Sequence, residues 1–152
     1  GFPVHTYILG EGEEHRKLVE YVREQQLEES VSFLGYQINP YKYLSKCDLF
    51  VCTSFAEGFS TAATEALIVG TPVCTVEVSG MKEMLGEHNE YGIVTTNDED
   101  AFFNGVKSLI ENDKVLEHYR VQAAIRGEAF DTESTVKATE KMFLELVGGN
   151  ND

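Results

Sequence analysis

The chain has 152 residues, the size of one domain, and its 42% apolar and 25% charged residues are typical of a globular protein. A formal net charge of -14 argues against general nucleic-acid binding, which depends on Lys and Arg neutralising phosphates. No apolar run approaches the roughly 20 residues of a membrane-spanning helix, and no signal-peptide pattern opens the chain. Cys47, Cys52 and Cys74 form no CxxC pair and lie in or beside apolar runs, which predicts free thiols in a reducing cytoplasm.

Short apolar runs alternate along the chain with segments of helical periodicity. Strands are expected at 5–9, 31–34, 49–53, 72–76 and 91–95. Helices are expected over about 13–28, 40–46, 60–69, 98–112, 114–127 and 132–147. Gly70 should end the helix at 60–69, because glycine readily takes the left-handed backbone angles of a helix end. Residues 148–152 are expected to be a disordered tail.

Apolar strands separated by helices imply a parallel sheet that is covered on both faces. Right-handed crossovers make such a sheet a doubly wound, Rossmann-like α/β layer, in which ligands bind beyond the carboxyl ends of the strands. The site is therefore expected among the loops at 10–13, 35–39, 54–60 and 77–83. Gly10-Glu11-Gly12 lacks the third glycine of a dinucleotide fingerprint, so we interpret it as a turn.

The segment 54–65 follows an expected strand and opens an expected helix. Ser60 and Thr61 are good N-cap residues, and the unpaired N–H groups of the first helical turn can bind a phosphate oxygen. Glu57 and Glu65 bracket this helix start, and carboxylates accept strong hydrogen bonds from sugar hydroxyls. The alternative is that Glu57 is an ordinary loop carboxylate and Glu65 a solvated helix residue.

Several motifs resemble those of the retaining family-4 glycosyltransferases, which have the GT-B fold. Glu57 and Glu65, in the frame Glu-Gly-Phe-Ser-x4-Glu-Ala-Leu-x2-Gly-Thr-Pro-Val, are similar to the family's E-x7-E signature. Four further segments resemble family motifs in the same order: Ile8–Gly12, Val31–Gly35, Ser79–Glu83 and Phe130–Glu133. The resemblance covers residues 4–147 and implies a Rossmann-like half of a GT-B fold.

The resemblance implies roles for individual residues. Glu57 would be the catalytic residue that holds a hydroxyl of the transferred sugar, and Glu65 would bind the donor ribose. The remaining substrate-binding residues would be Gly58, Phe59 and Ser60 along the sugar and diphosphate, Thr61 at the diphosphate, and Gly35 and Tyr36 near the base. The donor would be a nucleotide-diphosphate sugar, a UDP-sugar in our interpretation, bound without metal or other cofactor. Tyr36, Tyr41 and Tyr43 are expected to pack a short helix, with the wall of a base pocket as the alternative.

Family members also carry an Arg and a Lys that clamp the diphosphate, at positions that would precede Gly1, and an N-terminal acceptor-binding domain. We therefore expect residues 1–147 to be a donor-binding domain truncated at its N-terminus and inactive by itself. Lys82 is the only cation expected near the site, with a solvated lysine as the alternative interpretation. The full-length protein would act in polysaccharide or glycolipid synthesis, with peripheral membrane association as a possibility.

Two other functions remain open from the residues alone. A nucleotide-sugar hydrolase or epimerase of the same fold would need catalytic His and acidic residues near the cleft, and the sequence places none there. A non-catalytic nucleotide-sugar-binding module is the second alternative, against which the presence of both Glu57 and Glu65 counts.

Overall fold

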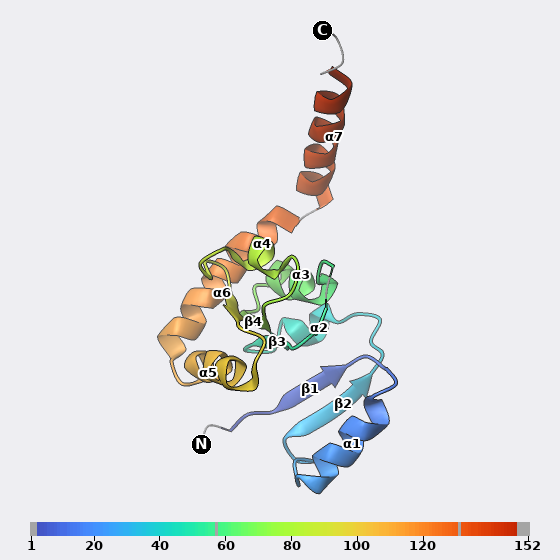
Figure 1. Cartoon of the computed structure of the whole chain (residues 1–152), viewed down its shortest axis with the longest axis vertical. Helices are drawn as coiled ribbons and strands as arrows, with labels where there is room; N and C mark the ends of the chain where they lie inside the picture. The colour runs from blue at the N-terminus through green and yellow to red at the C-terminus, as the bar shows by residue number, and fades with distance from the viewer. Residues whose placement is uncertain (1–2, 57, 131, 149–152) are drawn as a thin grey trace. The chain divides into compact units, whose positions relative to one another are not determined.

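The computed structural model describes residues 3–56, 58–130 and 132–148, which form helices and parallel strands (Figure 1). The chain divides into two compact units, residues 1–42 and 43–152, and each is described by itself. The described helices include none that is both long and apolar enough to cross a membrane.

The first unit is a single β-α-β arrangement. Strand β1 (Thr6–Leu9) leads into helix α1 (His15–Glu24), and strand β2 (Val31–Gly35) returns parallel to β1. Helix α1 is shorter than the expected 13–28, because Gln26 takes a left-handed conformation (φ 56°) directly after the last turn. Helix α2 (Tyr41–Leu44) spans the boundary between the units.

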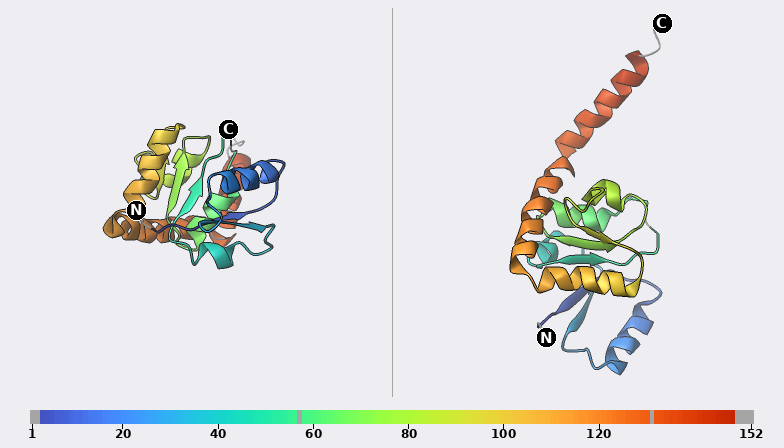
Figure 2. Two further views of the ribbon diagram at one scale, coloured as in Figure 1. Left: turned by 90° about the horizontal axis from the view of Figure 1, so that it is seen from below. Right: turned by 60° about the vertical axis from the view of Figure 1, so that its left-hand side comes forward.

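The second unit contains a three-stranded parallel sheet in the order β3-β4-β5. Its strands are β3 (Phe50–Cys52), β4 (Val73–Val76) and β5 (Ile93–Thr95). Its helices are α3 (Thr61–Ile68), α4 (Met81–Leu85), α5 (Glu99–Ile110), α6 (Asp113–Gly127), the 3-10 turn η1 (Glu128–Phe130) and α7 (Thr132–Gly148). Helices α3 and α5 both contact the sheet, and Figure 2 shows them on opposite faces of it. Strand β4 is therefore covered on both sides, and all four of its residues are buried.

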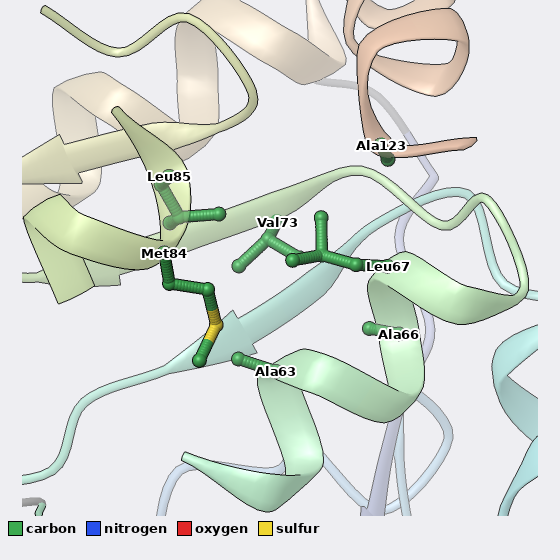
Figure 3. Packing of buried hydrophobic residues seen from close by; sticks show 7 residues of the cluster. All are labelled: Ala63, Ala66, Leu67, Val73, Met84, Leu85 and Ala123. Carbon is green, nitrogen blue, oxygen red and sulfur yellow. The ribbon is translucent and has the colours of Figure 1, made fainter. Parts of the chain in front are cut away.

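The core of the second unit lies between helix α3 and the sheet (Figure 3). Its buried side chains are Ala63, Ala66, Leu67, Val73, Met84, Leu85 and Ala123. The small alanines of α3 allow α6 to pack closely against it. Helix α3 ends as expected at Gly70, which has a φ of +74° and donates its N–H to the Leu67 carbonyl.

The pairing of consecutive strands breaks between β2 and β3. The expected α/β class with parallel strands is confirmed, although the strands are paired in two ladders. Helix α7 includes Gly148, so it ends one residue later than expected, and residues 149–152 of the expected tail lie outside the described residues.

Candidate functional site

Helix α3 follows strand β3 after the loop 53–60, and of the two expected cap residues, Ser60 and Thr61, it is Ser60 that caps the helix. The buried Ser60 hydroxyl oxygen accepts the Ala63 N–H at 3.4 Å, and the Ser60 carbonyl accepts the Thr64 hydroxyl at 3.0 Å. The Ser60 hydroxyl oxygen and carbonyl are therefore both used to start the helix.

The first two amides of helix α3 are available to a ligand. Among the described residues, no acceptor binds the N–H groups of Thr61 and Ala62, and both residues are exposed. Unpaired amides at a helix start, together with the helix dipole, favour a phosphate oxygen or another anion. The Thr61 amide can therefore bind an anion, and its role at a diphosphate stays a prediction from the sequence.

Glu65 lies one turn further along α3, on the same side of the helix as Thr61. It is half-buried between the buried residues Ala63 and Ala66, and the described residues offer its carboxylate neither a hydrogen bond nor an ion pair. Burial of a charge without a partner is costly. A carboxylate in this setting can accept hydrogen bonds from a ligand, and the role of Glu65 stays a prediction from the sequence.

The loop before α3 exposes apolar surface and backbone. Phe59 is 54% exposed, and a Cβ added to Gly58 would point into open space. Glu57, the expected catalytic residue, lies outside the described residues. Its role therefore stays a prediction from the sequence.

Lys82, the second residue of helix α4, is a cation that is already paired. Lys82 donates a hydrogen bond to Glu77 at 2.6 Å, and both side chains are about half exposed. This hydrogen bond, with the charges of Glu77 and Glu87, raises the pKa of Lys82. Sequence reasoning missed Glu77 as the partner, although an acidic residue directly after an apolar strand was a signal for it. Lys82 is accordingly a partly solvated lysine in a surface ion pair.

In the first unit, the carboxyl ends of β1 and β2 border a hollow of about 520 Å³. The residues that line it are Glu11, Gly12, His15, Phe33, Leu34 and Gly35. The Gly35 carbonyl accepts the Gly10 N–H at 2.8 Å, which extends the pairing of the two strands, and a turn follows in which His15 donates its N–H to the Gly12 carbonyl at 3.1 Å. Tyr36 follows at the rim of the strand and is largely exposed. Gly35 thus borders this open hollow, and sequence reasoning did not single out His15 or Phe33.

The expected site residues are divided between the two units. Gly58, Phe59, Ser60, Thr61 and Glu65 are adjacent in the second unit, whereas Gly35 and Tyr36 belong to the first. Within the described ranges, no three His, Cys, Asp or Glu side chains are grouped closely enough to hold a metal ion.

Comparison with known proteins identifies the family. The family model described as "Glycosyl transferases group 1" matches residues 3–126, more than half of the chain. The chain therefore belongs to the group 1 glycosyl transferases, and the resemblance found in its motifs is confirmed.

Two relatives illustrate the similarity. The chain is 38% identical over 139 residues to the N-acetylgalactosamine-N,N'-diacetylbacillosaminyl-diphospho-undecaprenol 4-alpha-N-acetylgalactosaminyltransferase of Campylobacter jejuni. It is 33% identical over 125 residues to an uncharacterized glycosyltransferase of Methanocaldococcus jannaschii. These matches cover 90% and 72% of this chain but only 38% and 31% of the relatives.

Solved structures of GT-B glycosyltransferases share the fold. TarM of Staphylococcus aureus, in complex with fondaparinux, alpha-GlcNAc-glycerol and UDP, has a TM-score of 0.80 at 26% identity. HepE of Anabaena, in complex with UDP, has a TM-score of 0.78 at 27% identity. The matches cover 92% and 91% of this chain and 29% and 40% of those chains, so this chain corresponds to a part of each enzyme.

Proposed function

We propose that this chain binds the nucleotide-sugar donor of a retaining glycosyltransferase, with a UDP-sugar as the donor. The observation that carries the proposal is the half-buried carboxylate of Glu65, which has no partner among the described residues. It lies one turn beyond the amides of Thr61 and Ala62, which no described acceptor binds. In this proposal the Glu65 carboxylate accepts hydrogen bonds from the ribose diol, and the amides of Thr61 and Ala62 donate hydrogen bonds to the diphosphate. The UDP in the similar structures of TarM and HepE supports this choice of nucleotide.

In the proposed mechanism, charge develops on the diphosphate as the bond to the sugar breaks. The amides at the start of α3 stabilise that charge, and no metal ion is required. Glu57 holds a hydroxyl of the transferred sugar, while the backbone of Gly58 and Phe59 lines the sugar. Gly35 and Tyr36 contact the base through their backbone.

The names of relatives support retention and suggest a class of sugar and acceptor. The relative from Campylobacter jejuni is named as an alpha-N-acetylgalactosaminyltransferase acting on a diphospho-undecaprenol glycan. A poly(ribitol-phosphate) alpha-N-acetylglucosaminyltransferase of Staphylococcus aureus is also similar, at 25% identity. Since common UDP-N-acetylhexosamines are α-linked, an α-linked product means retention. We propose an N-acetylhexosamine donor and a glycan or glycolipid acceptor, used at the cytoplasmic surface of a membrane.

We further propose that residues 1–147 form the donor domain and that the acceptor binds to another part of the complete enzyme. The match to the Campylobacter jejuni relative covers 90% of this chain but only 38% of that protein, which supports this division. Catalysis requires donor and acceptor to be held in register. The 152-residue chain should therefore bind the donor without transferring the sugar.

The test is calorimetric titration of the 152-residue chain with UDP, in magnesium and in EDTA. We expect saturable binding of equal strength in both, with weaker binding of ADP and GDP. Strong dependence on magnesium would contradict the metal-independent mechanism, and no UDP binding at millimolar concentration would contradict the proposed function itself.

A further inference from the structure

Arg126, near the end of helix α6, binds the carboxyl end of helix α4. Its Nε donates to the Met84 carbonyl and its Nη2 to the Glu83 carbonyl, both at 2.8 Å. The last carbonyls of a helix have no partner within the helix, so these bonds cap α4. Because the guanidinium group is planar and its donors form a rigid fork, the two bonds also fix its orientation.

The same guanidinium group lies beside two aromatic rings. Its Cζ is 5.0 Å from the ring centroid of Phe130 and 5.3 Å from that of Tyr91, within the range of cation–π attraction. Phe130 in turn meets the ring of Phe59 edge to face, with centroids 6.1 Å apart and planes at 68°. A continuous series of contacts thus joins the end of α4, through Arg126 and Phe130, to Phe59.

This arrangement is not a general property of the arginines of helix α6. Arg120, on the same helix, forms surface ion pairs at 3.5 Å with Asp48 and Glu117. Arg126 forms no ion pair with any described residue, although the chain carries 26 acidic residues. Arg126 instead contacts backbone carbonyls and aromatic rings. These contacts fix the position of its side chain and do not neutralise its charge.

We propose that Arg126 is a positioning residue for the sugar subsite, acting through Phe130 on Phe59. The inference rests on the proposed function, in which the backbone of 58–60 lines the donor sugar. Phe59 is otherwise exposed at the end of a loop, and the ring of Phe130 limits where it can lie. If the contacts of Arg126 are lost, the ring of Phe130 is no longer fixed. The loop that contacts the sugar then loses the support of Phe130 at Phe59.

The test compares Arg126→Gln with Arg120→Gln in the 152-residue chain. UDP, UDP-GlcNAc, UDP-GalNAc and UDP-glucose are titrated into both variants, and the amide and ring resonances of Phe59 are followed by NMR. For Arg126→Gln we expect UDP to bind within about twofold of wild type, while the best UDP-sugar loses about two- to thirtyfold. The Phe59 resonances should shift without ligand. Arg120→Gln should change neither the affinities for UDP and the UDP-sugars nor the Phe59 resonances.

A second variant covers loss of folding in Arg126→Gln. Phe130→Leu keeps an apolar side chain but removes the ring that meets Phe59, and it should reproduce the selective loss of UDP-sugar affinity. An equal loss for UDP and UDP-sugar would indicate a merely structural role and overturn the inference.

The remaining outcomes are also decisive. Identical behaviour of Arg126→Gln and Arg120→Gln would overturn the inference alone, as would a wild-type chain that binds UDP and every UDP-sugar equally. Absence of UDP binding by the wild-type chain would instead overturn the proposed function, and this inference with it.

Discussion

Gly80 lies so close to Gly58 that a Cβ added to Gly80 would be 2.9 Å from the Gly58 carbonyl oxygen. Gly80 is the N-cap of helix α4 and has a φ of +79°. The loop that we assign to the donor sugar therefore rests directly on the start of α4, and only glycine leaves room for this contact.

Gly80→Ala should weaken UDP-sugar binding by displacing the backbone of Gly58. Left-handed backbone angles cost an alanine about 1–2 kcal/mol, which is expected as a loss of stability in urea unfolding. Gly70→Ala is the matched control, since Gly70 has a φ of +74° and its added Cβ would make an ordinary 3.5 Å contact with Ala124. Both variants should lose stability, but only Gly80→Ala should lose affinity for the UDP-sugar. Equal affinities of Gly80→Ala and Gly70→Ala for the UDP-sugar would show that the 58–60 loop tolerates the displacement.

Ser60→Ala should lower both stability and UDP affinity. The Ser60 hydroxyl accepts the Ala63 N–H, and loss of an N-cap costs about 1 kcal/mol. Asn112 caps helix α6 in a comparable way, with its side chain accepting from Lys114 and Val115 at 3.2 and 3.3 Å. Asn112→Ala should therefore lose similar stability by urea unfolding while keeping full UDP affinity. A normal UDP affinity in Ser60→Ala would mean that the start of α3 does not hold the diphosphate.

The features that the sequence predicted correctly depend on local chemistry. Ser60 as a cap and Gly70 as a helix end follow from backbone hydrogen bonds within a few residues. The ion pair of Lys82 with Glu77 and the packing of Arg126 against Phe130 were missed, because they depend on how loops and distant helices meet. The division of Gly35 and Glu65 between two units could not be anticipated either, since the motifs establish only their order along the chain.

The stability of the chain should fall as pH rises above 9, partly because of Cys74. Burial in strand β4 raises the pKa of this thiol from its ordinary value near 9 to about 12. Between these values the unfolded chain loses a proton that the folded chain retains, so the stability contributed below pH 9 is lost as pH rises. The slope is at most about 1.4 kcal/mol per pH unit. Between pH 8.5 and 10.5, the free energy of unfolding in urea should decrease less for Cys74→Ala than for wild type. Equal decreases would show that Cys74 does not cause the loss of stability.

Glu65→Gln should weaken binding of UDP itself. The substitution keeps the size of the side chain but removes the anionic acceptor that we assign to the ribose diol. Removing a partner from a charged hydrogen bond costs about 1.5–3 kcal/mol, or roughly 10- to 150-fold in affinity. Calorimetric titration of UDP measures this loss. Glu111→Gln is the control, because it removes the same charge from an exposed position that pairs only loosely with Lys107, at 3.8 Å.

Glu57→Gln should behave differently, because its proposed partner is on the transferred sugar. UDP alone should bind almost normally, whereas the additional affinity of the UDP-sugar should fall, as should the rate of transfer in the complete enzyme. The contrast between Glu57→Gln and Glu65→Gln separates a sugar contact from a ribose contact. If Glu65→Gln bound UDP as tightly as Glu111→Gln, Glu65 would be an ordinary helix residue. If Glu57→Gln and Glu65→Gln lost UDP affinity equally, the roles that we assign to the two carboxylates would be wrong.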